Sequence, residues 1–213
     1  MADKFIYIAG ATRGTGLEVV RVLRAANRPV VALVRPGSDA AELESIGAEI
    51  VRGDVMDHAS FASSIDGAGA IINCVGGKRG EPRPDLDGVK NLVDAARQAG
   101  VRRFILVSAA GVGDSYAAIS ERAHEFLDPV LEIKAQAEDY LRESGLDYTI
   151  IRPGAMDSEP ASGNGLLTDD PLVSGTIHRA DLARLVVDCL DDPASLGRVC
   201  NAVDSELIGV TFF

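Results

Sequence analysis

The sequence predicts a single domain of the α/β class, with a doubly wound parallel sheet covered by helices on both faces. Short apolar runs alternate with segments of helical periodicity along the chain. No repeat and no Pro/Ser-rich linker divides its 213 residues. A glycine-rich turn at residues 10–16 joins the first apolar run to the first helical segment. Strands that alternate with helices form right-handed βαβ crossovers, and these crossovers produce a parallel sheet.

The elements follow in order from this alternation. Apolar runs with the length of buried parallel strands lie at 5–9, 30–34, 49–51, 70–75, 104–107, 148–151 and 199–203. Helical periodicity between them predicts helices at 17–26, 40–46, 60–65, 89–99, 130–144 and 180–190. Gly100 and Gly145 are expected to end two of these helices, and Asp87 is expected to cap the helix from residue 89.

The glycine-rich turn lies where a parallel-sheet protein binds a pyrophosphate. It reads Gly-Ala-Thr-Arg-Gly-Thr-Gly over residues 10–16. Glycine permits a positive φ and a close approach of phosphate to the backbone, and the helix that follows directs its positive dipole end there. We therefore expect a Rossmann-type dinucleotide site; a flavodoxin-like fold without a dinucleotide is the alternative. The predicted contacts are Gly10, Thr12, Arg13, Gly14, Thr15 and Gly16.

Composition narrows the function further. The net charge of −11 argues against nucleic acid as a partner, because its phosphates would be repelled. No apolar run could span a bilayer, and no signal peptide precedes the first strand. Cys74 and Cys200 on predicted strands and Cys189 on a predicted helix are widely spaced, which indicates buried free thiols rather than a metal site. We expect a cytoplasmic protein without metal or membrane partner, either a monomer or a small homo-oligomer.

The second predicted strand indicates which nucleotide is bound. An Asp or Glu usually holds a free ribose 2′-hydroxyl about 20 residues after the glycines. Here the strand ends in Arg35, which can form a bidentate contact with a 2′-phosphate. Arg13 in the glycine turn can reach the same phosphate. The sequence therefore favours NADP(H) over NAD(H), with two solvated surface arginines as the alternative.

Seven segments also follow the order of a known family. They include Gly-Asp-Val-Met-Asp at 53–57 and Asn-Cys-Val-Gly-Gly at 73–77, with the others at 10–16, 32–35, 100–114, 144–154 and 178–183. Over nearly its whole length, the chain resembles the atypical short-chain dehydrogenases/reductases. It is most similar to the single-domain NAD(P)H-binding group of biliverdin-IXβ/flavin reductases and NmrA-like proteins. The resemblance implies an NAD(P)-binding Rossmann domain over residues 1–213.

The resemblance also implies roles for individual residues. Standard members use a serine and a Tyr-xxx-Lys pair, which Ser108 and Lys134 match in part, whereas Val130 occupies the tyrosine position. Ser108 would then bond the acceptor, and Lys134 would hold the nicotinamide ribose rather than relay a proton. The remaining implied cofactor contacts are Asp54 at the adenine edge, Val55 on the adenine ring, Cys74, Val75 and Gly76, and the backbone of Arg152, Pro153 and Gly154 beside the nicotinamide carboxamide. In the turn, Arg13 replaces a glycine that is usual in relatives of the flavin reductases.

Two long segments and a proton source complete the predicted site. Residues 76–86 and 155–176 follow predicted strands and are candidates for walls of the substrate site, the second as a mobile lid. With Val130 in place of tyrosine, solvent is the first candidate for the proton donor and Tyr116 the second. His124 and His178 are further donors with a suitable intrinsic pKa.

The function predicted from these features is that of an NADPH-dependent reductase. Its acceptor would be a small, flat, conjugated molecule such as a flavin, a quinone or a tetrapyrrole. A non-catalytic, NADP-binding redox sensor of the NmrA-like type is the first alternative, and Val130 favours it, because a sensor can lose a catalytic tyrosine. A ketoreductase or epimerase that uses a substitute acid is the second alternative.

Overall fold

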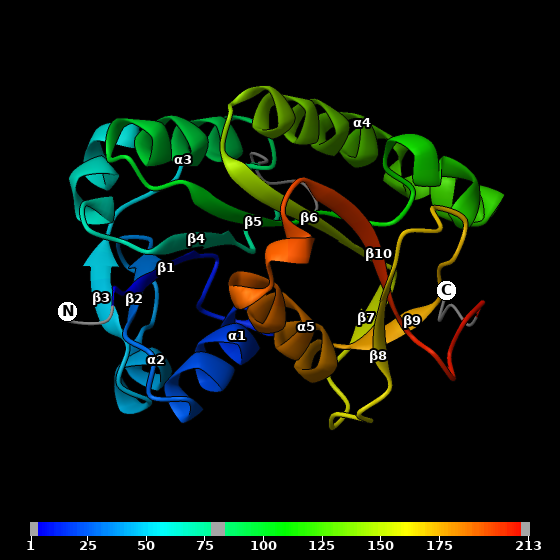
Figure 1. Ribbon diagram of the computed structural model, residues 1–213, viewed down its shortest axis with the longest axis horizontal. Helices are drawn as coiled ribbons and strands as arrows, with labels where there is room; N and C mark the ends of the chain where they lie inside the picture. The colour runs from blue at the N-terminus through cyan, green and yellow to red at the C-terminus, as the bar shows by residue number, and fades with distance from the viewer. Residues whose placement is uncertain (1–3, 78–83, 210–213) are drawn as a thin grey trace.

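The computed structural model describes residues 4–77 and 84–209. Its central sheet has the strand order β3-β2-β1-β4-β5-β6-β10-β8 and carries helices on both faces (Figure 1). The strands through β10 are parallel, and β8 pairs antiparallel with β10 at the edge. The predicted doubly wound α/β fold in a single domain is therefore confirmed. The strands of this sheet are β1 (Ile6–Ala9), β2 (Val30–Val34), β3 (Glu49–Arg52), β4 (Ala70–Asn73), β5 (Arg103–Val107), β6 (Asp147–Pro153), β8 (Gly165–Thr168) and β10 (Arg198–Asp204).

Two hydrophobic layers hold the helices to the sheet. Alternate residues of a strand point to opposite faces. Ile6 and Ile8 of β1 therefore belong to the core under α1 and α5, whereas Tyr7 and Ala9 belong to the core under α3 and α4. Figure 1 shows these helix pairs on opposite sides of the sheet. The helices are α1 (Gly14–Ala25), α2 (Ala41–Ser45), α3 (Asp87–Gln98), α4 (Glu121–Glu143) and α5 (Arg179–Asp191).

Helix starts differ from the prediction at three places. Helix α1 begins at Gly14, within the glycine turn, rather than at residue 17. The helix predicted from residue 130 begins at Glu121, after Ser120, whose hydroxyl accepts the Ala123 amide at 3.2 Å. Pro129 lies inside this helix, where it removes one backbone donor and interrupts the sequence pattern. Asp87 does not cap α3 but is its first residue, where its charge favours the positive end of the helix dipole.

Two further segments have a different local structure from the prediction. Residues 60–65 form short 3₁₀ turns, His58–Ser60 and Ala62–Ile65, instead of an α-helix. The segment 155–176, predicted as one loop, contains β7 (Ala155–Asp157) and β8, and β9 (Thr176–His178) begins at its end. β7 and β9 pair as a separate parallel ribbon. These strands are too short to give a recognisable alternation in the sequence.

The predicted glycine stops and free thiols are confirmed. Gly100 and Gly145 follow α3 and α4 with φ values of +68° and +76°. Cys74, Cys189 and Cys200 are free. Cys189 and Cys200 are buried as predicted, whereas Cys74 is half-buried and comes directly after β4 rather than within it. Burial raises the pKa of Cys200 to about 12. Within residues 4–77 and 84–209, no helix is long and apolar enough to cross a membrane, and no group of side chains could hold a metal ion.

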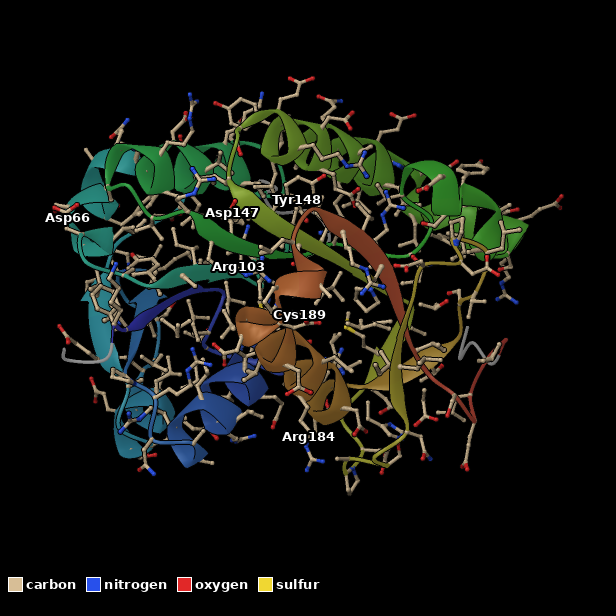
Figure 2. All side chains as sticks on the ribbon, viewed as in Figure 1. Asp66, Arg103, Asp147, Tyr148, Arg184 and Cys189 are labelled. Atoms are coloured by element: carbon tan, nitrogen blue, oxygen red, sulfur yellow. The ribbon has the colours of Figure 1, made fainter. Side chains whose placement is uncertain are left out.

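The amino ends of the strands are joined by a half-buried arginine. Arg103 begins β5 and donates to the carbonyl oxygen of Cys189 in α5 at 2.6 Å (Figure 2). It also donates to the Ser195 hydroxyl and the Thr149 hydroxyl, both at 2.8 Å. Burial lowers the pKa of this guanidinium. The loops that carry the predicted site residues lie at the opposite, carboxyl edge of the sheet.

Candidate functional site

The glycine turn is a cradle that side chains would fill. Gly10 has a φ of +80°, and a Cβ placed on it would lie 2.6 Å from the carbonyl carbon and oxygen of Cys74. A Cβ on Gly16 would lie 2.1 Å from the carbonyl oxygen of Gly10. Arg13 is the N-cap of α1 but makes no capping hydrogen bond with its side chain. The first amides of α1 are therefore available to an anion such as a pyrophosphate.

The two predicted guanidinium groups come from neighbouring strand ends. β1 and β2 pair directly, so the turn that carries Arg13 and the loop that begins at Arg35 leave the same edge of the sheet. Both side chains are exposed. Their predicted contact with a 2′-phosphate stays a prediction, and so do the predicted contacts of Thr12 and Thr15.

Arg179 is a third guanidinium beside the turn, and the sequence analysis missed it. A Cβ on Gly14 would lie 3.5 Å from its Nε, and its Nη1 donates to the Ser158 hydroxyl at 3.1 Å. These residues help to line a cavity of about 270 Å³. Arg179 is the first residue of α5, where a positive charge opposes the helix dipole. This unfavourable placement is the sequence signal that could have identified it.

The β7–β9 ribbon lies against the start of α1. The Thr15 hydroxyl is 3.6 Å from the sulfur of Met156 in β7. Within the ribbon, Nδ1 of His178 is 2.6 Å from Oδ1 of Asp157. This hydrogen bond raises the pKa of His178. Burial opposes ionisation of Asp157, but the bond to His178 outweighs it, so the pKa of that carboxyl is lowered.

The ribbon should be weakened by alkaline pH. A raised pKa of His178 means that its contribution is complete below the unfolded value of about 6.5 and is lost as the pH rises through the folded value. The contribution of Asp157 is present above its unfolded value of about 3.9 and is lost only as the pH falls through its lowered folded value. The difference in Tm between the wild type and His178→Gln should therefore be largest between the two unfolded pKa values, about 3.9 and about 6.5, and should shrink toward pH 9. A difference that does not change with pH would contradict this.

Ser108 is part of a buried ionic network. It directly follows β5, is 6% exposed and donates from Oγ to Oε1 of Glu138 at 2.6 Å. Arg152 of β6 reaches both oxygens of this carboxylate, with Nε at 3.0 Å and Nη2 at 2.7 Å, and it also pairs with Asp114. Glu138 is 1% exposed and Arg152 2%. Arg142 adds a contact to Oε2 at 3.2 Å.

These charges stabilise one another. Burial disfavours the charged form of Arg152, but its carboxylate partners outweigh burial and raise its pKa. The hydrogen bond from Arg152 holds the pKa of Asp114 below its usual range. The sequence analysis did not identify Glu138, and it assigned Arg152 a role only through its backbone.

Lys134 lies one helical turn before Glu138 and is also paired. Its Nζ is 2.9 Å from Oδ1 of buried Asp85, whose Oδ2 accepts the Gly77 amide at 3.1 Å. The ion pair therefore fastens the loop after β4 to α4. Val130, half-buried, lies one turn further back on the same helix. Residues 78–83 of the predicted loop 76–86 lie outside the described part of the chain.

Tyr116 lies in a turn after β5, and the structure does not join it to this network. Its side chain is 54% exposed, and its ring stacks on His124 with 3.8 Å between the ring centroids. Nδ1 of His124 is in turn 2.6 Å from Asp128. Within residues 4–77 and 84–209, no hydrogen bond links Tyr116 to Ser108 or Lys134.

The remaining predicted contacts lie at the carboxyl edge of the sheet or just beyond it. Asp54 is half-buried and its Oδ1 accepts the Met56 amide at 3.0 Å, whereas Val55 is buried. Cys74, Val75 and Gly76 follow β4. Gly154 follows β6, and a Cβ on it would lie 2.1 Å from the carbonyl oxygen of Gly175. These positions agree with a nucleotide laid across the strand ends; the contacts themselves stay predictions.

Comparison with known proteins assigns the chain to a family. The sequence model of a family described as NAD(P)H-binding matches residues 10–193. The solved structure of ChuY, an anaerobilin reductase from Escherichia coli O157:H7, has a TM-score of 0.86 and 31% identity, over 95% of this chain and 98% of that chain. An uncharacterised chloroplast protein of Arabidopsis thaliana is 34% identical over 94% of this chain and 76% of its own length. YhfK of Bacillus subtilis, an uncharacterised sugar epimerase, is 33% identical over 94% of both chains.

The family match includes the glycine turn, the loop that begins at Arg35, the buried network around Glu138 and the start of α5. It therefore covers the carboxyl edge of the sheet on which the candidate site is built. The chain belongs to the NAD(P)H-binding family.

Proposed function

We propose that this protein is an NADPH-dependent oxidoreductase that transfers a hydride to a small conjugated acceptor, such as a flavin, a quinone or a tetrapyrrole. The observation that carries the proposal is the glycine turn at the start of α1, where Gly10 and Gly16 leave no room for a Cβ, Arg13 is the N-cap and Arg179 lies beside Gly14. When bound, the nicotinamide supplies the hydride, and the protein supplies binding and orientation. The likeness to a protein named as a reductase supports this reaction class.

The side chains near the reaction centre favour an acceptor that needs no strong acid. Val130 cannot donate a proton, Lys134 is paired with Asp85, and the Ser108 hydroxyl is bonded to Glu138. Solvent is therefore the proposed proton source, with Tyr116 second. Flavins and tetrapyrroles are suitable acceptors, because their conjugated rings can take a hydride before they are protonated.

The test is NADPH oxidation, followed at 340 nm, with FMN, biliverdin and menadione as acceptors. Turnover with one of them supports the reductase. Tight NADPH binding without turnover on any acceptor would instead support the redox sensor. Val130 favours that alternative, and so do Ser108 and Lys134, whose polar groups are already paired with Glu138 and Asp85. The name of YhfK keeps an epimerase as the third candidate, and a sugar-nucleotide assay would identify it.

We also propose a cytoplasmic location, because the three thiols are free.

Arg35 should determine the choice between the two nucleotides. Replacing Arg35 with Asp removes a charge-assisted contact worth about 1.5–3 kcal/mol, so the Kd for NADPH should rise by about tenfold or more, while the Kd for NADH stays the same or falls. Arg97→Asp is the matched control, because Arg97 lies in the last turn of α3 and changes the net charge equally. Isothermal titration calorimetry measures both constants. An unchanged Kd for NADPH would remove Arg35 from the site.

Arg179 should act on both nucleotides alike. Because it lies beside Gly14 rather than at the end of β2, it faces the pyrophosphate position that NADPH and NADH share. Arg179→Ala should raise both Kd values by about tenfold. Arg184→Ala is the control, since Arg184 is an exposed arginine on the same helix (Figure 2). If only NADPH binding weakened, Arg179 would belong to the 2′-phosphate site instead.

A further inference from the structure

The hydroxyl of Ser108 has a fixed hydrogen-bonding direction. Its oxygen is 2.6 Å from Oε1 of Glu138, and that carboxylate also receives Nε and Nη2 of Arg152 and the guanidinium of Arg142. Within the described residues 4–77 and 84–209, the side chain of Ser108 makes no other hydrogen bond. A serine hydroxyl has one donor hydrogen and two acceptor lone pairs.

Glu138 is held in its ionised form by its neighbours. Two guanidinium groups surround a carboxylate that is 1% exposed, and arginine does not give up its proton in proteins. An ionised carboxylate only accepts hydrogen bonds. The hydrogen of Ser108 is therefore committed to Glu138, and only the lone pairs of its oxygen remain for a ligand at the carboxyl end of β5.

We propose that Ser108 recognises the acceptor only by accepting a hydrogen bond, and that Glu138 and Arg152 are the positioning residues that impose this direction. The inference rests on the proposed function and deepens it. An acceptor that presents a ring N–H or O–H at this point satisfies the serine, whereas one that presents only carbonyl oxygens meets a lone pair there. The site is thus selective for N–H-bearing conjugated rings, such as flavins and tetrapyrroles, over quinones.

A pair of flavins that differ by one donor tests the proposal. Oxidised lumiflavin has a single ring N–H, at N3, and 3-methyllumiflavin lacks it. Their Kd values for the protein saturated with NADP⁺, measured by flavin fluorescence, should differ by about tenfold in favour of lumiflavin. In Ser108→Ala the ratio should fall toward one, because the acceptor oxygen is gone.

Glu138→Gln separates the effect of hydrogen-bond direction from the steric effect of the N3 methyl group of 3-methyllumiflavin. The amide should place its oxygen toward the two Nη2 groups of Arg152 and Arg142, and its NH₂ toward Ser108 and the single Nε of Arg152. This orientation leaves one guanidinium donor unpaired instead of two, and the serine hydroxyl can reverse its role. Ser108 would then accept from Gln and donate to the ligand. The preference for lumiflavin should disappear although the space around the ring is unchanged, and the kcat/KM with menadione should rise.

The outcomes are distinct from those of the reductase assay. Equal Kd values for the two flavins in the wild type, or binding of neither, overturn the proposal even if NADPH is oxidised with another acceptor. A tenfold ratio that survives in Glu138→Gln also overturns it, because the methyl group would then act by size alone. A ratio lost in both variants supports it even if no acceptor is turned over, in which case only the proposed function fails. If Glu138→Gln does not fold, as shown by circular dichroism, the wild-type ratio and Ser108→Ala decide.

Discussion

Replacing Arg152 with Met is expected to lower the free energy of unfolding by about 3–5 kcal/mol, because it leaves a buried carboxylate without its main partner. Glu138 is 1% exposed, and Arg152 supplies two of its hydrogen bonds from a side chain that is itself 2% exposed. Methionine can fill much of the vacated space but cannot compensate the charge. Urea denaturation measured at pH 7 gives the free energy directly.

Arg142 provides a matched control on the same carboxylate. Its guanidinium contacts Oε2 of Glu138 at 3.2 Å, but its side chain is 35% exposed, so Arg142→Met should cost less than about 1 kcal/mol. A double variant, Glu138→Leu with Arg152→Met, should recover part of the loss, because it removes both buried charges together. If Arg152→Met costs no more than Arg142→Met, then the network contributes little to stability and the ionised state assigned to Glu138 is in doubt.

The fold could be predicted from the sequence because its signals are local. Most strands of the parallel part contain an apolar run, and Gly100 and Gly145 end their helices with the positive φ that glycine allows. The glycine turn is likewise readable, since its three glycines lie within seven residues. Pro129 shows the limit of such reasoning, because packing keeps α4 continuous through a residue that local propensity treats as a stop.

The interior of the candidate site could not be predicted in the same way. Ser108, Glu138 and Arg152 come from β5, α4 and β6, and nothing in the sequence around each residue indicates its partners. The pair of Lys134 with Asp85 is equally non-local. Long-range contacts between charged side chains depend on register and on which helix face meets the sheet. A family pattern can propose Ser108 and Lys134 as site residues, but it does not reveal that Ser108 is hydrogen-bonded to Glu138 and Lys134 is paired with Asp85.

Gly10→Ala should weaken NADPH binding by about 100-fold, because it moves the backbone that forms the phosphate cradle. The new Cβ would lie 2.6 Å from the carbonyl group of Cys74, and this neighbour is backbone, which cannot rotate away. Either β1 or the segment after β4 must therefore shift. A shift of a few tenths of an ångström is enough to misalign two hydrogen bonds from backbone amides to the phosphate. Each of these hydrogen bonds is worth about 1.5–3 kcal/mol when it is charge-assisted. Calorimetric titration with NADPH measures the loss.

Gly145→Ala separates this effect from backbone strain. Gly145 has a φ of +76°, close to the +80° of Gly10, but a Cβ on it meets nothing within 4 Å. Both variants should lose about 1 kcal/mol of stability, because alanine is strained at positive φ, and Gly10→Ala should lose more because its Cβ also collides with backbone. Only Gly10→Ala should also lose affinity for NADPH, since only there does the side chain collide with the wall of the cradle. Equal affinities in the two variants would mean that the phosphate does not lie on this turn, and the assignment of the nucleotide site would then have to be abandoned.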